Sequence, residues 1–321
     1  MEETKPAQIR HGNTEHGSHS VAATATARHV STISPPSPTP MAQDRRAFLA
    51  TLGGVTLSVG WARNAFANLT EPVGKKLSRI GIQLYTLRSK AEKDLAGTLA
   101  EVARIGYKEV ELAGYYNHTA SEVRDLLAGN GLSAPSSHVA IEQIEREPAK
   151  TFADAKTVGN QWITVPNLSG KYDTVDDWKR AAARFNGVAA RVKSAGFRFA
   201  YHNHNTEIRR IGDVMPIEVL LSNTDRSLVS FEMDIYWVVN GGGNPVEILD
   251  RHPGRFKMLH VKDSAGPPDQ KMVDVGAGVI DFKTIFEHAK GIEHYFVEHD
   301  QPPDPFADAA ASFKYLANLN F

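Results

Sequence analysis

The stretch Phe256-Lys257-Met258-Leu259-His260-Val261-Lys262-Asp263 has an apolar body and ends in polar side chains. A short run of this kind is typical of a strand that is buried on both faces of a sheet. Seven other runs along the chain have the same form. We therefore expect eight strands, at residues 80–85, 107–112, 133–138, 161–166, 197–202, 229–234, 256–261 and 294–299.

Longer amphipathic patterns lie between these runs and predict helices at residues 95–105, 121–127, 175–195, 245–251, 282–289 and 306–319. Thr174, Asn244 and Asp281 stand where helix N-caps belong, and Pro245 fits a first helical position. Strands that alternate with helices are typical of parallel sheets. A doubly wound open sheet shares this alternation, but no G-x-G-x-x-G follows the first strand, and eight units favour closure. We expect an α/β fold, a single (β/α)8 TIM barrel, over residues 68–321.

Polar side chains stand at or near the carboxyl ends of the expected strands. They are Gln83, Glu111, His138, Asn167, His202, His204, Asp234, His260, Asp263 and Glu298. In a barrel these ends meet on the face where enzymes of this architecture place their active sites. A single buried His or Asp is more often a structural group whose hydrogen bonds are satisfied. A whole ring of such groups is hard to explain as structure, because each buried charge without a partner is costly.

Each of the last four expected strands contributes one residue of a type that binds metals. These residues are His202, Asp234, His260 and Glu298, and the chain has no Cys that could replace them. Two imidazoles and two carboxylates suit Mn, Co, Fe or Zn, with Mg as a further option, so we expect one divalent metal ion. Such an ion can polarise a carbonyl so that a base removes the neighbouring C–H and an enediolate forms. The enediolate can then lead to epimerisation, isomerisation or elimination.

Seven segments, in this order and spacing, resemble the sugar phosphate isomerase/epimerase superfamily, also called the xylose isomerase-like barrels. They are Gly81-Ile82-Gln83-Leu84-Tyr85-Thr86, Gly106-Tyr107-Lys108-Glu109-Val110-Glu111-Leu112, Tyr201-His202-Asn203-His204, Glu232-Met233-Asp234-Ile235-Tyr236-Trp237, His260-Val261-Lys262-Asp263, Val275-Gly276-Ala277-Gly278 with Asp281-Phe282, and Val297-Glu298-His299-Asp300. The likeness covers residues 78–321. The superfamily includes ketose 3-epimerases, inosose dehydratases and endonuclease IV relatives. It does not indicate the substrate.

The resemblance places metal ligands on Asp234, His260 and Glu298. Many family members end the fifth strand with Glu-Asn-His, whose Glu is both a ligand and one of two catalytic bases. This chain has His202-Asn203-His204 instead. We therefore expect His202 to be the fourth ligand and His204 to contact the substrate, and we do not expect proton exchange between two glutamates. Trp237, at a position where ketose epimerases often have a His, is a further departure.

Four residues are candidates for proton transfer: Glu298, which can act as a base while bound to metal, and Lys262, His138 and Glu111. Substrate contacts are expected from Gln83, His204, Tyr236, Trp237 and Asp263. Among these, Tyr236 and Trp237 offer a flat apolar wall on which pyranose faces stack. Ordinary barrel packing is the alternative for Tyr236, and an ion pair with Asp263 is the alternative for Lys262.

The segment Asp44-Arg45-Arg46-Ala47-Phe48-Leu49 is followed by an uncharged run at 50–62 and by Ala65-Phe66-Ala67. This layout predicts a twin-arginine export signal at 41–67, and so a periplasmic or otherwise exported protein that meets the Tat machinery. A buried amphipathic helix is the alternative, but the run has no helical periodicity. It is also too short to span a bilayer stably. Residues 1–40 are rich in Pro, Ser, Thr and His, and we expect them to be disordered, with a biological start at Met41.

Composition narrows the class of function. With 41% hydrophobic residues, 23% charged residues and a net charge of −1, the chain has no basic surface for nucleic acid. The leading hypothesis is a metal-dependent isomerase or epimerase that acts through an enediolate on a free, unphosphorylated sugar or keto-sugar. A rival is a lyase, dehydratase or hydrolase that eliminates from 3-keto-glycosides or keto-cyclitols. A third is a non-catalytic sugar-binding barrel. A small carbohydrate is the expected partner in each case.

Overall fold

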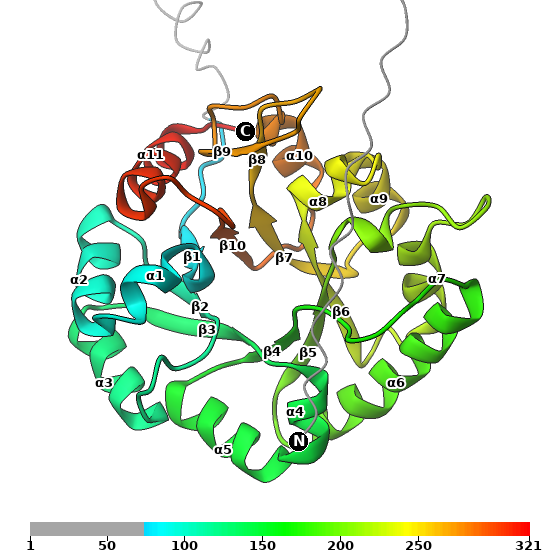
Figure 1. The fold of residues 1–321 in the computed structure, drawn as a ribbon, viewed down its shortest axis with the longest axis horizontal. Helices are drawn as coiled ribbons and strands as arrows, with labels where there is room; N and C mark the ends of the chain where they lie inside the picture. The colour runs from blue at the N-terminus through cyan, green and yellow to red at the C-terminus, as the bar shows by residue number, and fades with distance from the viewer. Residues whose placement is uncertain (1–73) are drawn as a thin grey trace, which may run out of the picture. The chain divides into compact units, whose positions relative to one another are not determined.

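A computed structural model describes residues 74–321, and Figure 1 shows its strands closing into a barrel. The eight parallel strands pair in the order β1-β10-β7-β6-β5-β4-β3-β2, and β2 returns to β1. The strands are β1 (Gly81–Gln83), β2 (Glu109–Leu112), β3 (Ser133–His138), β4 (Trp162–Val165), β5 (Arg198–His202), β6 (Val229–Asp234), β7 (Phe256–Val261) and β10 (His294–Val297). The predicted TIM barrel is confirmed. The disordered tract at 1–40 and the export signal at 41–67 lie outside the described residues.

Helices surround the barrel as an outer ring (Figure 1). They are α1 (Arg88–Ala91), α2 (Leu95–Ile105), α3 (Ala120–Gly129), α4 (Ile141–Arg146), α5 (Pro148–Val158), α6 (Val175–Ser194), α7 (Pro216–Asn223), α8 (Ile235–Asn240), α9 (Pro245–Arg251), α10 (Phe282–His288) and α11 (Pro305–Asn318). Two short 3-10 helices, η1 (Leu84–Leu87) and η2 (Asn205–Glu207), follow β1 and β5. A small hairpin, β8 (Asp263–Ser264) with β9 (Met272–Val273), follows β7. No helix among residues 74–321 is long and apolar enough to cross a membrane.

Sequence periodicity located most elements, with a few corrections. The strand expected at 80–85 ends at Gln83, whose side chain accepts a hydrogen bond from Tyr85 N and starts η1. Helices α1, α4, α5, α7 and α8 were not predicted. The expected N-caps are confirmed: the side chains of Thr174, Asn244 and Asp281 accept backbone N–H groups at the starts of α6, α9 and α10.

Apolar side chains fill one end of the barrel interior. Trp162, Ala200, Met258 and Phe296 form a compact buried cluster that is separate from the larger core between strands and helices. Because side chains alternate between the two faces of a strand, the residues two positions later point inward again. Three of these positions hold His202, His260 and Glu298. The apolar plug therefore lies beneath a polar layer on the side of the carboxyl ends of the strands.

Candidate active site

Charged side chains are concentrated in this polar layer and are almost completely removed from water. Glu111, Glu232, Asp234 and His260 are fully buried, and His202, Lys262 and Glu298 are at most 6% exposed. Five of these residues lie in β2, β5, β6 and β7, while Lys262 directly follows β7 and Glu298 directly follows β10. Parallel pairing aligns Asp234 with His260, so residues from adjacent strands lie at one level. A buried charge must be paired with an opposite charge, neutralised by a change of protonation, or bound to an ion.

Glu232 lies at the centre of three imidazoles. Its Oε2 is 3.0 Å from His138 Nε2, 3.1 Å from His202 Nδ1 and 3.1 Å from His260 Nε2. Its Oε1 is buried and has no hydrogen-bond partner among the described residues. We did not single out Glu232 from the sequence, although it precedes Asp234 by two positions and must therefore face the same side of β6.

Glu111 is fully buried and contacts four side chains that can donate hydrogen bonds. It accepts hydrogen bonds from Gln83 Nε2 at 2.7 Å and Ser136 Oγ at 2.5 Å, and it lies 2.6 Å from His260 Nε2. His138 Nε2 is 3.1 Å away. Gln83 and Glu111 thus support the imidazoles from beneath and do not line the cavity described below.

Lys262 occupies the space between three carboxylates. Its ammonium nitrogen is 2.8 Å from Asp300 Oδ1, 2.7 Å from Glu298 Oε2 and 2.9 Å from Asp234 Oδ2. Only the contact with Asp300 has hydrogen-bond geometry, so buried Asp234 Oδ2 accepts no hydrogen bond despite its cationic neighbour. Glu298 Oε2 is also 2.7 Å from His260 Nδ1.

Asp263 has a different role from the one expected. Its two carboxylate oxygens accept backbone N–H groups from Ser264, Gly276, Gly278 and Ile280 at 2.8 to 3.2 Å. The side chain therefore organises the loop after β9, lies outside the cavity and does not pair with Lys262. Consecutive residues of an extended chain point to opposite sides, which explains why Lys262 and Asp263 diverge.

The electrostatics favour protonated imidazoles beside the carboxylates. Burial lowers the pKa of His138, but the charges of Glu111 and Glu232 outweigh burial and raise it to about 9. Burial likewise opposes ionisation of His260, yet Glu232, Glu298 and Glu111 raise its pKa well above the ordinary value. For Glu232 itself, burial and Glu111 raise the pKa, but the imidazoles prevail and lower it to about 2.

Burial shifts the pKa values of two other groups, His202 and Asp234, toward their neutral forms. Burial, together with His260, lowers the pKa of His202 well below its ordinary value, so this imidazole is neutral and can offer a ring nitrogen to a metal ion. Burial raises the pKa of Asp234 to about 6 against the opposing charge of Lys262. A cation in addition to Lys262 would therefore stabilise the ionised form of Asp234.

Two overlapping groups of side chains are arranged so that they can hold a metal ion. One consists of His138, His202, Glu232 and His260, and the other of Asp234, His260 and Glu298; within each, the ligand atoms lie within 4.8 Å of one another. The four expected ligands are divided between these groups, with His202 Nε2 3.6 Å from Asp234 Oδ2. The unpartnered buried oxygens of Glu232 and Asp234 and the mixture of nitrogen and oxygen donors fit a divalent transition metal.

A cavity of about 470 Å³ opens above this cluster at the barrel mouth. Its lining includes His138, His202, His204, Lys262 and Glu298 from the expected set, and also Tyr85, Arg88, Ala113, Pro166, Asn167, Asp300 and Gln301. A volume of this size suits a small polar molecule. The cavity gives such a molecule access to three imidazoles, an ammonium group and two carboxylates.

The two expected aromatic contacts differ from each other. The Trp237 ring centroid lies 5.6 Å from that of His204, and Lys262 Nζ is 5.8 Å from the Trp237 ring, so Trp237 stands beside the cavity residues. The Tyr236 hydroxyl donates to the carbonyl of Gln270 at 2.7 Å. Tyr236 therefore anchors the segment between β8 and β9.

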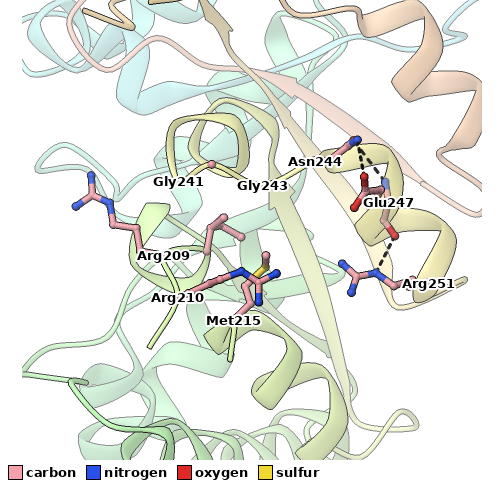
Figure 2. Close-up of a pocket in the computed structure, with 10 residues that line it drawn as sticks. Arg209, Arg210, Met215, Gly241, Gly243, Asn244, Glu247 and Arg251 are labelled. Carbon is pink, nitrogen blue, oxygen red and sulfur yellow. Dashed lines mark hydrogen bonds between the residues drawn. The ribbon is translucent and has the colours of Figure 1, made fainter. Parts of the chain in front are cut away.

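Figure 2 shows a different cavity, of about 530 Å³, between η2, the start of α7 and the α8–α9 turn. Three arginines line it, and two of them, Arg210 and Arg251, are engaged with their own surroundings. Arg251 donates to the Glu247 carbonyl and pairs with Glu218 at 3.1 Å, and Arg210 donates to the Asp213 carbonyl. No buried carboxylate–imidazole cluster lines this cavity, so the barrel mouth is the candidate active site.

Comparisons with known proteins agree with this fold. Residues 99–318 match the family described as xylose isomerase-like TIM barrel. The inosose dehydratase of Lacticaseibacillus casei is 30% identical over 171 residues, 46% of this chain and 56% of that protein, so the chain spans about half the length of this relative. The inosose dehydratase of Clostridium beijerinckii is 24% identical over 269 residues, 70% of this chain and 89% of that protein. A crystal structure of a sugar phosphate isomerase/epimerase from Parabacteroides distasonis is 31% identical, with a TM-score of 0.66, and the match covers 75% of this chain and 98% of that one.

Proposed function

This chain belongs to the xylose isomerase-like TIM barrel family, and on that premise we propose that it is a carbohydrate lyase. The reaction is the removal of a proton next to a ketone, followed by loss of a hydroxyl or alkoxyl group from the adjacent carbon. The substrate class is a keto-cyclitol or a keto-glycoside. The observation that carries this proposal is that one side of the cavity offers a carboxylate and another side offers a protonated imidazole.

Glu298 is the proposed base. Its Oε2 is held by His260 and Lys262, while no hydrogen bond engages Oε1 within residues 74–321. Burial raises the pKa of Glu298, but Lys262 and His260 outweigh it and hold the pKa well below its ordinary value. The carboxylate is therefore ionised at neutral pH and has a free oxygen to accept a proton from carbon.

His138 is the proposed acid. Glu111 and Glu232 hold its Nε2, and no described residue hydrogen-bonds its Nδ1. Because the pKa is raised to about 9, the ring carries protons on both nitrogens at neutral pH. The proton on Nδ1 can pass to the departing oxygen as the C–O bond breaks and the electrons of the C–H bond form the new double bond. The products are an unsaturated ketone and water or an alcohol.

We infer that His202, Asp234, His260 and Glu298, which are divided between the two groups of possible ligands, would hold a divalent metal ion; when bound, this ion would polarise the substrate carbonyl and make the neighbouring C–H more acidic. His202 suits this role because it is neutral, and Asp234 because its Oδ2 accepts no hydrogen bond, while its Oδ1 accepts one from the backbone N–H of Trp237 at 2.9 Å. Mn, Fe, Co and Zn match this donor set, and Mg is a further option.

An unphosphorylated substrate is part of the proposal. Arg88 donates to the carbonyls of Tyr85 and Asp300, and Lys262 pairs with three carboxylates. The cations that line the cavity are thus already engaged, and a phosphate group would compete with buried carboxylates for them. The export through the Tat machinery that we expect from residues 41–67 is in line with this proposal, because free or glycosidic sugars are the substrates that an exported enzyme would meet.

A sugar isomerase or epimerase is the second candidate, and the resemblance to the Parabacteroides distasonis protein favours it. Both reactions begin with the same proton removal. The lyase is preferred because Glu298 and Asp300, the carboxylates that line the cavity, both come from the end of β10 and the segment after it. Epimerisation through two bases requires bases on opposite faces of the substrate, and His202 replaces the second glutamate.

Incubation of metal-loaded protein with keto-cyclitols, 3-keto-glycosides and free ketoses in deuterated water tests these functions together. Release of water or an alcohol with formation of an unsaturated ketone supports the lyase. Deuterium incorporation with epimers or isomers and no loss of substituent supports the isomerase. Tight binding without either product supports a sugar-binding barrel and would overturn both enzymatic proposals.

A further inference from the structure

A cavity of about 410 Å³ adjoins the candidate active site. Asn167 and His204 line both this cavity and the one at the barrel mouth. The remaining lining residues belong to the loop after β4, to α6 and to η2: Leu168, Gly170, Lys171, Tyr172, Asp173, Trp178, Thr206 and Glu207. The two cavities therefore continue into each other past one imidazole and one amide.

The adjoining cavity has a rigid aromatic wall. The rings of Tyr172 and Trp178 lie with centroids 5.1 Å apart, and the Trp178 indole N–H donates to the carbonyl of Tyr172 at 3.1 Å. Trp178 is 2% exposed and lies in the first turn of α6, so its buried ring holds Tyr172 and the loop after β4 in place. Half-buried Tyr172 presents an aromatic surface at the cavity, a surface on which the C–H face of a sugar ring packs well.

His204 marks the boundary between the two cavities. Its backbone N–H donates to Glu207 Oε2 at 2.8 Å, which fixes the position of the residue. Its ring lies between those of His202, at 4.9 Å, and Trp237, at 5.6 Å. A ligand that crosses from one cavity to the other would meet both the His204 imidazole and the side-chain amide of Asn167, because these two residues line both cavities.

We propose that the Tyr172–Trp178 cavity is a subsite for the departing part of the substrate, and that the enzyme acts on a glycoside of two ring units. This inference rests on the proposed lyase function and specifies its substrate class. The keto-sugar ring occupies the mouth cavity above His138 and Glu298, and the second ring packs on Tyr172. The bond between the rings passes His204.

The test compares a keto-glycoside with a methyl leaving group and one with a glucosyl leaving group. Tyr172→Ala should raise the ratio of the two KM values, two-ring over one-ring, by about fivefold to tenfold, because only the larger substrate loses the aromatic contact. Tyr85→Ala is the matched control. Tyr85 lines the mouth cavity alone, so its loss should leave the ratio within about twofold.

Equal changes in both KM values for Tyr172→Ala, or a wild-type protein that does not distinguish the two substrates, would overturn the subsite. Tyr172→Leu, which keeps apolar volume in the loop, replaces the alanine variant if that protein fails to fold. If no substrate is turned over, the proposed function fails, and calorimetric binding of the same two glycosides still decides the subsite. Tighter binding of the two-ring compound, lost in Tyr172→Ala, supports it, and equal binding overturns it.

Discussion

The ammonium nitrogen of Lys262 lies 2.7 Å from Glu298 Oε2, inside a cluster where burial removes both groups almost entirely from water. The same nitrogen lies 2.9 Å from Asp234 Oδ2, so one side chain supplies positive charge to two of the expected metal ligands. Lys262 therefore compensates charge in the metal-free protein, and it stands in the region where a divalent ion would bind.

Replacement of this lysine tests that relationship. Lys262→Met should bind Mn²⁺ or Zn²⁺ at least about tenfold more tightly than wild type, because the ion no longer competes with an ammonium group. Without metal, the variant should be about 3–5 kcal/mol less stable, since Asp234 and Glu298 lose their buried partner. Titration calorimetry and chemical unfolding measure the two effects. Lys271→Met is the control: its side chain is 77% exposed and 3.9 Å from Asp269, so neither quantity should change.

Glu111 and, after it, Glu232 raise the pKa of His138, so removal of the Glu232 charge should change the protonation of this imidazole. Glu232→Gln keeps the volume of the side chain but removes the charge, so the pKa of His138 should fall from about 9 toward the ordinary 6.5. An NMR titration of the His138 ring in metal-free protein follows this change. Glu293→Gln removes a carboxylate that pairs with Arg198 at the opposite end of β5, and it should leave the titration unchanged. A His138 pKa near 9 in Glu232→Gln would show that Glu111 alone sets it.

The same shift predicts how stability depends on pH. The pKa of His138 is about 9 in the folded protein and 6.5 as an ordinary value, so protonation favours the folded state. This contribution, about 3 kcal/mol, is complete below about pH 6.5 and is lost as pH rises through about 9. The difference in unfolding free energy between wild type and His138→Gln, both metal-free, should shrink across that window. A difference that is constant from pH 6 to pH 10 would contradict the prediction.

Asp263 should support the loop and should not bind substrate. Asp263→Asn removes a charged acceptor of four backbone N–H groups, which should cost about 2–4 kcal/mol of stability. Hydrogen exchange at Gly276, Gly278 and Ile280 should accelerate, whereas metal affinity should remain within about twofold of wild type because Asp263 touches no ligand. Unchanged hydrogen exchange in Asp263→Asn together with a large rise in KM would show that Asp263 contacts the substrate instead.

Much of the fold follows from local pattern. The strands at Val229–Asp234 and Phe256–Val261 have the expected bounds, because apolar residues and polar ends mark buried parallel strands clearly. The strand at Ser133–His138 also has the expected bounds, although its sequence, SAPSSH, contains no apolar run. Helix α4, at Ile141–Arg146, was missed because its six residues carry too little amphipathic repeat to stand out. Helix α8 begins at Ile235, where an apolar run continues from the strand without a break.

The site was less predictable for a related reason. Strand ends pointed to His202, Asp234, His260 and Glu298, but the sequence does not show which side chains share a neighbour in space. Glu232 lies inside a strand, and its three imidazole contacts come from β3, β5 and β7. The pairing of Lys262 with Asp300 joins residues 38 apart, so it depends on the closure of β7 against β10.

The central claim is that Glu298 removes a proton from carbon next to a ketone and that His138 protonates the group that leaves. The most direct test is proton NMR of metal-loaded protein with a 3-keto-glycoside in deuterated water. Wild type should lose the signal of the proton next to the ketone and release the alcohol at the same rate. Glu298→Gln should slow both by at least about a hundredfold, and His138→Gln should slow alcohol release more than proton exchange. Alcohol release by Glu298→Gln at the wild-type rate, or binding of the glycoside without any exchange in wild type, would contradict the account.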